Sequence, residues 1–252
     1  MALTKVIGDG IGSVGDDLSL VSDGSIVNFG VNSEISLTHV HNSGLTLASS
    51  VGATTFKIGR AGATDAKVIF DGNAQNYHIG VDDTNDSLVI GLGDTLGTTD
   101  SMVINAAGII TKPLQPAFQA KPASDQTNLA VGTEVNILFG TEIFDNNADY
   151  DGSFIFTAPV TGKYHFSGVV RLGAVDAASE YYIIRLRTSN RDRDFIFDSN
   201  EFSSDLDYVS FPFAITTDMD AGDQAYMRYY QNSGTAQTDV DSSSVFSGHL
   251  VC

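Results

Sequence analysis

Apolar and polar residues alternate in short runs along most of this chain, with the two-residue period of strands that bury one face. The clearest example lies between positions 144 and 166, where Phe154 and Phe156 precede a second alternation through Tyr164 and Phe166. The segment Ala158–Gly162 separates the two runs, because proline donates no ladder hydrogen bond and glycine tolerates a left-handed turn. No stretch keeps a convincing helical period beyond two turns, so the pattern predicts an all-β protein.

The first half of the chain has the shortest runs, each about four to six residues long. Turn segments such as Ser22–Ser25 and Asp82–Asn85 separate them. The predicted strands are Leu18–Val21, Ile26–Val31, Ile35–Val40, Leu45–Ala48, Thr54–Ile58, Val68–Phe70, Tyr77–Val81, Ser87–Ile90 and Met102–Ile104, with a closing hairpin at Ala106–Thr111. Strands this short and rich in glycine bury little within one chain, so we expect a fibre shaft in which three intertwined chains share a core.

Two prolines, Pro113 and Pro116, mark a stiff connector that interrupts the strand pattern. The predicted parts are an N-terminal attachment segment at 1–17, the β-rich shaft at 18–112, the connector at 113–116 and a β-sandwich head at 117–252. In a sandwich, two sheets face each other across about 10 Å filled by inward side chains. The predicted core of the head comprises Phe154, Phe156, Tyr164, Phe166, Val170, Ile184, Leu186, Phe211, Phe213, Met227, Tyr229, Phe246 and Leu250.

The head carries a recognisable signature of an aromatic residue, Asn, Tyr-Asp, Phe and then Gly-x-Tyr-x-Phe, with a closing strand near the end of the chain. The matching residues are Phe144, Asn146, Tyr150, Asp151, Phe156, Gly162, Tyr164, Phe166, Phe246 and Gly248. In these residues the chain resembles the C1q/tumour-necrosis-factor superfamily. Two positions depart from the pattern: the Tyr150-to-Phe156 spacing is short, and Gly168 replaces an aromatic residue. The resemblance implies a C1q-like jelly roll that assembles as a homotrimer.

Charge narrows the range of partners. The 252 residues include 13 Lys and Arg against 31 Asp and Glu, a net charge of −18, which makes nucleic acid an unsuitable partner. The only cysteine is the last residue, Cys252, so no intrachain disulfide forms and the role of this thiol is left open. The N-terminus lacks a long apolar run, so we predict neither a signal peptide nor membrane insertion.

The region from residue 18 to 111 is similar to segments of bacteriophage tail-fibre and appendage proteins, in phrases such as Ile35–Val40 and Asp86–Gly93. Taken with the C1q resemblance, this similarity implies a viral structural protein: a trimeric tail fibre made in the host cytoplasm and carried on the virion. Its predicted partners are its own copies, other virion tail proteins, and a host cell-surface glycan or protein that the head binds for attachment. Three alternatives remain open: a virion adaptor or decoration protein, a small polysaccharide depolymerase, and a non-viral bacterial surface adhesin.

Three groups of residues are candidates for metal or ligand binding. His39 and His41 have a spacing that could place imidazoles on a trimer axis, or they simply flank a turn. Aspartate pairs with a one-residue gap occur at Asp205/Asp207, Asp218/Asp220 and Asp239/Asp241. These pairs either keep loops hydrated or hold calcium, so no cofactor is predicted while calcium is left open.

The alternating run Arg191–Asp194 is expected at an exposed strand end or in a loop, with contact to an anionic sugar as the sharper alternative. No nucleophile elbow, zinc-binding His-Glu-x-x-His helix or phosphate-cradling glycine loop is present, so we predict no catalytic residue and no enzyme. The aromatic residues of the signature are expected to pack in the core. Recognition is expected in the loops Asp176–Glu180, Arg191–Asp194 and Ser233–Ser244.

Overall fold

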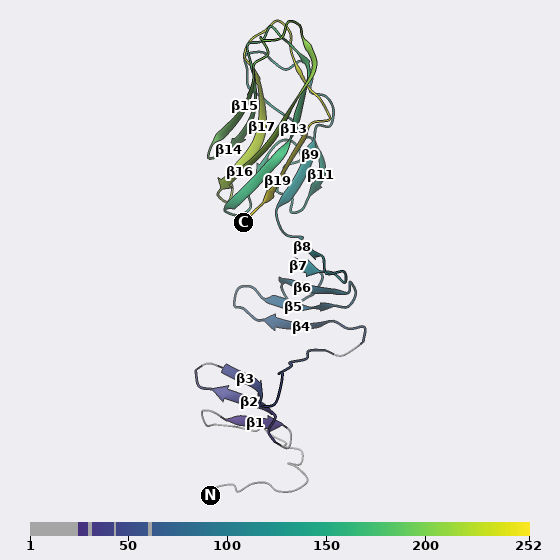
Figure 1. Ribbon diagram of the computed structural model, residues 1–252, viewed down its shortest axis with the longest axis vertical. Coiled ribbons are helices and arrows are strands. Elements are labelled where there is room, and N and C mark those ends of the chain that lie inside the picture. Colours follow the sequence, from purple (N-terminus) through teal and green to yellow (C-terminus); the bar gives the residue numbers. More distant parts are fainter. Residues whose placement is uncertain (1–24, 30–31, 43, 60–61) are drawn as a thin grey trace. The chain divides into compact units, whose positions relative to one another are not determined.

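A computed structural model describes residues 25–29, 32–42, 44–59 and 62–252. Every regular element in these ranges is a strand, in agreement with the predicted all-β class (Figure 1). The predicted strand Leu18–Val21 and the attachment segment 1–17 lie outside the described residues. The chain divides into two compact units, Met1–Ile58 and Gly59–Cys252.

The first unit contains one antiparallel sheet in the order β1-β2-β3. The strands are β1 (Ile26–Phe29), β2 (Ile35–Val40) and β3 (Gly44–Ser49). The predicted strand Thr54–Ile58 is wrong, because this segment forms no regular element and leaves Phe56 76% exposed. Alternation alone does not make a strand, since the backbone also needs a hydrogen-bonding partner, and no described strand pairs with this segment.

The second unit begins with an antiparallel meander in the order β4-β5-β6-β7-β8. Its strands are β4 (Ala66–Phe70), β5 (Tyr77–Asp82), β6 (Ser87–Leu92), β7 (Asp100–Ile104) and β8 (Ile110–Thr111). The central pair is in simple register, with Ile79 opposite Ile90 and Val81 opposite Leu88.

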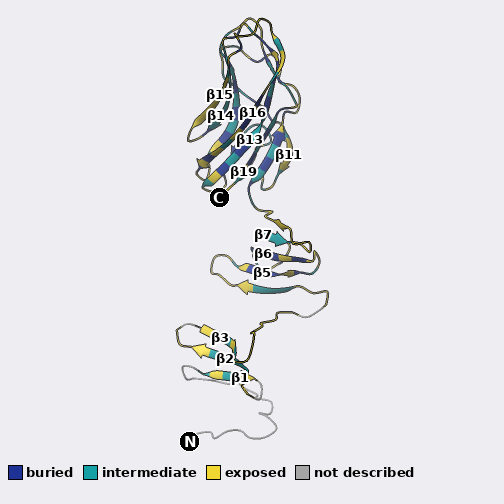
Figure 2. Ribbon diagram, in the orientation of Figure 1, coloured by how far each residue is buried: buried dark blue, intermediate teal, exposed yellow. Residues whose placement is uncertain are grey.

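The two faces of this meander differ in burial, as the alternating colours of β5 and β6 show (Figure 2). On one face His78, Gly80, Val89 and Gly91 are buried. The loop that joins β6 to β7 lies over this face: Gly93 accepts a hydrogen bond from His78 Nδ1 at 2.9 Å when that nitrogen carries the proton. The opposite face presents the large apolar side chains of β4, β5 and β6 to solvent: Phe70, Tyr77, Ile79, Val81, Leu88 and Ile90, which are 36–60% exposed. We call these six residues the bare apolar face.

The head is a sandwich of two antiparallel sheets. One sheet runs β11-β9-β19-β13-β16, with β18 paired to β13, and the other runs β10-β17-β14-β15, with β12 paired to β17 (Figure 1). The strands are β9 (Ala117–Lys121), β10 (Val135–Asn136), β11 (Thr141–Asp145), β12 (Phe156–Thr157), β13 (Gly162–Val175), β14 (Tyr182–Thr188), β15 (Asp192–Phe197), β16 (Leu206–Met219), β17 (Gln224–Gln231), β18 (Asp239–Val240) and β19 (Val245–Leu250). This mixed strand order joins residues that are far apart in the sequence into each sheet.

The core of the head lies between the two sheets and is rich in aromatic rings. Phe118 stacks on Phe156 with ring centroids 5.0 Å apart, and Phe246 meets Phe118 edge-on at 5.0 Å. Of the predicted core residues, all are buried except Phe154 and Leu250, which are partly buried. The two-residue period therefore identified the inward faces of the head correctly.

Two glycines allow strands and rings to approach more closely than any other residue would. A Cβ at Gly248 would lie 2.6 Å from the ring of Phe166 and 2.8 Å from that of Phe118. A Cβ at Gly168 would lie 2.0 Å from the carbonyl oxygen of Val245. The departure of Gly168 from the family's aromatic residue thus has a local cause, since β13 and β19 leave no room there for a side chain.

Candidate binding site

The signature stretch forms the scaffold of the head. Tyr150 is buried, stacks on Phe118 at 4.9 Å and donates a hydrogen bond from its hydroxyl to the carbonyl of Phe139 at 3.1 Å. Burial, together with the nearby carboxylates of Asp151 and Glu142, raises the pKa of the Tyr150 hydroxyl above its ordinary value. This side chain is neutral and structural.

Asp151 explains how the signature works with a short Tyr150-to-Phe156 spacing. Its Oδ1 atom accepts hydrogen bonds from the amides of Ser153, Phe154 and Ile155 at 2.9, 2.9 and 3.0 Å. The capped loop is tight enough for Tyr150 and Phe156 to pair as an isolated antiparallel bridge.

The expectation that the aromatic residues of the signature all pack in the core is wrong for Phe144. This side chain is 46% exposed on β11, beside the 52% exposed Ile143. β11 is an edge strand, and its register with β9 shifts between Glu142 and Phe144. An irregularity of this kind turns a side chain away from the face that strict alternation assigns to it.

The first residue of the loop Asp176–Glu180 has a structural role. Recognition is therefore not the role of the whole loop. Asp176 is buried, and its carboxylate accepts hydrogen bonds from the amides of Ala178 (2.8 Å), Thr235 (2.5 Å) and Ala236 (2.7 Å). Burial alone would raise the pKa of Asp176, but these amides together hold it below its ordinary value. Asp176 therefore fixes its own loop to the segment that follows β17.

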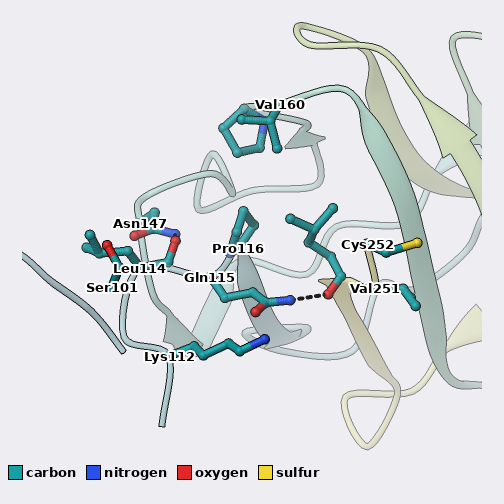
Figure 3. A pocket seen from close by; sticks show the side chains of 11 residues that line it. Ser101, Lys112, Leu114, Gln115, Pro116, Asn147, Val160, Val251 and Cys252 are labelled. Atoms are coloured by element: carbon teal, nitrogen blue, oxygen red, sulfur yellow. Dashed lines mark hydrogen bonds between the residues drawn. The ribbon is translucent and has the colours of Figure 1, made fainter. Parts of the chain in front are cut away.

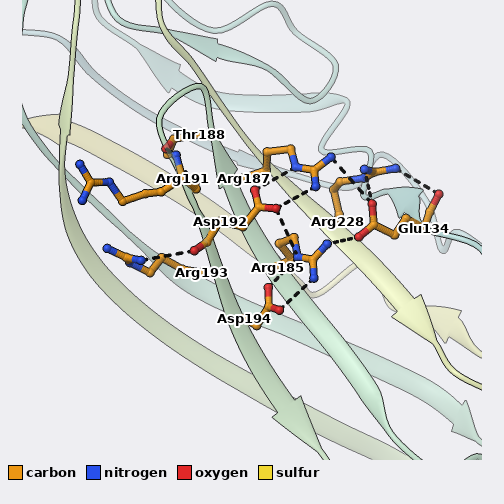
Figure 4. Close-up of polar contacts among 9 residues, drawn as sticks. All are labelled: Glu134, Arg185, Arg187, Thr188, Arg191, Asp192, Arg193, Asp194 and Arg228. Carbon is orange, nitrogen blue, oxygen red and sulfur yellow. Dashed lines mark hydrogen bonds and ion pairs between the residues drawn. The ribbon is translucent and has the colours of Figure 1, made fainter.

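The outer face of the second sheet carries a compact network of ion pairs (Figure 4). Glu134 accepts hydrogen bonds or ion pairs from Arg185 and Arg228, while Arg185 forks onto Asp194 at 2.6 and 2.8 Å. A second fork joins Arg187 to Asp192 at 2.9 and 2.8 Å. These arginines already have carboxylate partners, so we interpret the network as one that stabilises the sheet.

Sequence reasoning did not identify this network. The signal was present in the hairpin, because an Arg-x-Arg strand followed by a short turn and an Asp-x-Asp strand places opposite charges side by side. Of the two positions expected for Arg191–Asp194, a strand end or a loop, the structure shows a strand end, because β15 begins at Asp192.

Two of the aspartate pairs approach each other at one end of the sandwich. Asp125, Asp207, Asp239 and Asp241 line a hollow of about 400 Å³ together with Tyr208. Several of these carboxylates cap loops: Asp239 accepts from the amide of Asn128 at 2.7 Å, and Asp241 accepts from that of Ser243 at 2.8 Å. The Ser243 hydroxyl and amide hold the pKa of Asp241 below its ordinary value.

The remaining aspartates and the histidine pair are placed elsewhere. Asp205 accepts from the amide of Ala177 at 3.0 Å, and Asp218 pairs with Arg191 at 2.6 Å. His39 lies in β2, whereas His41 lies in the turn after it, so the two do not share a strand. Among the residues that the structure describes, no group of three or more His, Cys, Asp or Glu side chains is arranged to hold a metal ion.

The connector closes one side of a larger, mainly apolar hollow of about 700 Å³ (Figure 3). Leu114, Pro116, Val160 and Val251 line it, and Gln115 donates a hydrogen bond from Nε2 to the carbonyl of Leu250 at 2.7 Å. The exposed thiol of Cys252 also lies at its edge. The connector is thus hydrogen-bonded to the final strand of the head.

The comparison with family models agrees with the fold of the head. A family model described as "C1q domain" matches residues 117–251. Among solved structures, the chain is similar to the globular domain of zebrafish complement 1qA, with 17% identity, a TM-score of 0.41, and coverage of 55% of this chain and 98% of that one. It is also similar to murine APRIL, with 11% identity, a TM-score of 0.40, and coverage of 54% and 99%. No curated protein matches the chain.

The two-sheet head and its aromatic core define a β-sandwich domain. No described segment forms a helix of the length and apolarity that crossing a membrane would require. By its match to the family model over residues 117–251, the chain belongs to the C1q domain family. Domains of this family commonly form trimers and are typically not catalytic.

Proposed function

We propose that this protein is a trimeric bacteriophage tail-fibre or appendage protein whose C1q domain binds the host cell surface. The observation that carries the proposal is the bare apolar face of the β4–β8 meander. Six large apolar side chains on three adjacent strands are 36–60% exposed in the single chain. Contiguous apolar surface of this kind is uncommon on soluble monomers and marks an interaction site.

Copies of the same chain are the partner that best fits this face. On the opposite face, the chain's own β6–β7 loop covers β5 and β6, so this is the less open of the two sides. Exposed apolar side chains also occur on the head, at Leu138, Ile143 and Phe144, and support association there as well.

The proposed mechanism is adhesion. A trimer presents three identical heads, and linked binding to repeated surface groups raises the apparent affinity by about 100-fold or more when the geometry allows simultaneous contact. The net charge of −18 disfavours nonspecific capture by nucleic acid released from lysed cells. The proposed location is the virion, with the N-terminal segment as its attachment point.

Two measurements test the proposal. Light scattering of the purified protein should give three times the 26.7 kDa chain mass, and a clean monomer would overturn the trimer. Fluorescently labelled protein should decorate susceptible host cells and block infection. Absence of cell binding, with the protein still found in purified virions, would favour the adaptor or decoration role. Sustained release of new reducing ends from host polysaccharide would instead establish a depolymerase.

A further inference from the structure

The alternation of Arg191, Asp192, Arg193 and Asp194 separates acidic from basic side chains. Both aspartates point to the face of β15 where Arg185 and Arg187 lie, whereas Arg191 and Arg193 extend away from that cluster (Figure 4). The hydrogen bond from Arg187 lowers the pKa of Asp192, so the carboxylate stays charged and committed to that pair. The two basic side chains are left on the other side of the strand.

Arg193 occupies an unusual place in the sandwich. Its register partner on β14 is Leu186, and the next partners along the same face are Ile184 with Phe195 and Tyr182 with Phe197. This row faces the core, so Arg193 continues a buried row at the point where the two sheets open. Its guanidinium has one weak contact among the described residues, a hydrogen bond to the carbonyl of Asp192 at 3.4 Å.

A hollow of about 300 Å³ lies at this opening. It is lined by Lys163 of β13, Arg191, Arg193, and the β16 residues Thr216, Thr217 and Asp218. Asp218 is the one carboxylate in this lining, and it is paired with Arg191, whose Nη2 atom lies 2.6 and 2.9 Å from its two oxygens. Within the part of the chain that the structure describes, Lys163 and Arg193 take part in no ion pair. A hollow with excess positive charge is notable in a chain whose net charge is −18.

The geometry points to this hollow as a binding site for an anionic group on an acidic polysaccharide, a carboxylate or a sulfate. A guanidinium without a carboxylate partner offers a planar pair of donors that matches an oxyanion, and Lys163 adds a second charge. Thr216 contributes a hydroxyl and is hydrogen-bonded through Oγ1 to Nδ1 of His165 at 3.0 Å. The volume is at the lower end of the range for small-molecule sites, which suits one sugar ring. This inference deepens, and rests on, the proposed binding to a cell surface.

Calorimetric titration of the full-length protein at low ionic strength tests the site. The probes are tetragalacturonate, which carries carboxylates, sulfated cellotetraose, and neutral cellotetraose. Both acidic probes are expected to bind and to weaken as salt is added, and the tighter of the two identifies the anionic group. The neutral probe is expected not to bind. Equal binding of neutral and acidic probes, or no binding of either acidic probe, would overturn the proposal.

Substitutions locate the binding. Arg193→Gln and Lys163→Gln should each lower the affinity about tenfold, since each removes a charge-assisted contact. Arg193→Lys should retain part of the affinity, because it keeps the charge and loses the fork. Lys121→Gln is the matched control: it makes the same change in net charge on an exposed residue of β9 and should leave binding unchanged. If Arg193→Gln and Lys163→Gln bind the acidic probes as tightly as the unaltered protein does, the assignment of the site to this hollow is wrong.

Cell attachment separates this inference from the proposed function. If the unaltered protein binds host cells and Arg193→Gln binds them equally well, adhesion stands and this site is excluded. If the unaltered protein binds tetragalacturonate or sulfated cellotetraose but no host cell, the site stands and the proposed function fails.

Discussion

The Oδ2 atom of Asp176 lies 2.7 Å from the backbone nitrogen of Ala236, so one buried carboxylate ties the loop after β13 to the segment between β17 and β18. The hydroxyl of Tyr182 completes this joint, because it accepts a hydrogen bond from the amide of Asp176 at 2.9 Å and contacts Thr238 at 3.0 Å. Two segments that were each expected to be recognition loops are therefore joined by hydrogen bonds at this end of the head.

Replacing Asp176 by Asn should destabilise the head by about 2–4 kcal/mol, because the buried amides of Ala178, Thr235 and Ala236 lose a charged acceptor. Urea denaturation followed by circular dichroism measures the effect. Asp198→Asn, at an exposed position of the same head, makes the same chemical change and should cost less than about 0.5 kcal/mol. Equal stabilities of the two variants would show that Asp176 is not a joint.

Acid should lower the free energy of unfolding of the protein. The pKa values of Asp176, Asp192 and Asp241 are all lowered in the folded chain. Each group therefore contributes stability that is complete above the ordinary aspartate pKa of about 3.9 and is lost as the pH falls through the lower folded value. Unfolding free energies measured from neutral pH downward should decline below about pH 4. Asp176→Asn should flatten that decline, and an unchanged slope would contradict the assignment.

Gly168→Ala should destabilise the head by about 1–3 kcal/mol or more, because the new methyl group would lie 2.0 Å from the carbonyl oxygen of Val245. The strands β13 and β19 must separate to admit it. Gly140→Ala is the control, since its nearest contact is Ala123 at 3.8 Å, an ordinary packing distance. Differential scanning calorimetry of both variants measures the difference, and equal melting temperatures would refute the steric argument.

Charging the bare apolar face should separate the chains. The double variant Ile79→Asp/Ile90→Asp places carboxylates on two residues that are register partners in the middle of the face. Light scattering should then report a smaller species than for the unaltered protein. Asn73→Asp, in the exposed loop between β4 and β5, is the control and should keep the original mass. A double variant with unchanged mass would remove this face from the interface.

Sequence patterning identified the core residues of the head well because aromatic and branched residues alternate there with polar ones over long strands. It failed at Thr54–Ile58, where the same alternation has no pairing partner, and at Phe144, where an irregular register reverses the side that faces inward. Neither a missing neighbour nor a register shift is visible in a local pattern.

Long-range proximity was the other limit. Lys163 and Arg193 line one hollow although 30 positions separate them in the sequence, because β13 and β15 belong to different sheets that meet at an open edge. The burial of Asp176 was equally hidden, since an aspartate in a loop normally remains in water. Both features depend on how the two sheets are stacked, which composition and spacing do not specify.

The open side of the β4–β8 meander has a thermodynamic consequence. If copies of the chain supply the missing cover, folding of this region and association are a single equilibrium, and its stability depends on protein concentration. The head has its own closed core, so its melting temperature should fall less on dilution than that of the meander. Dilution should therefore unfold the meander under conditions in which the C1q domain remains folded.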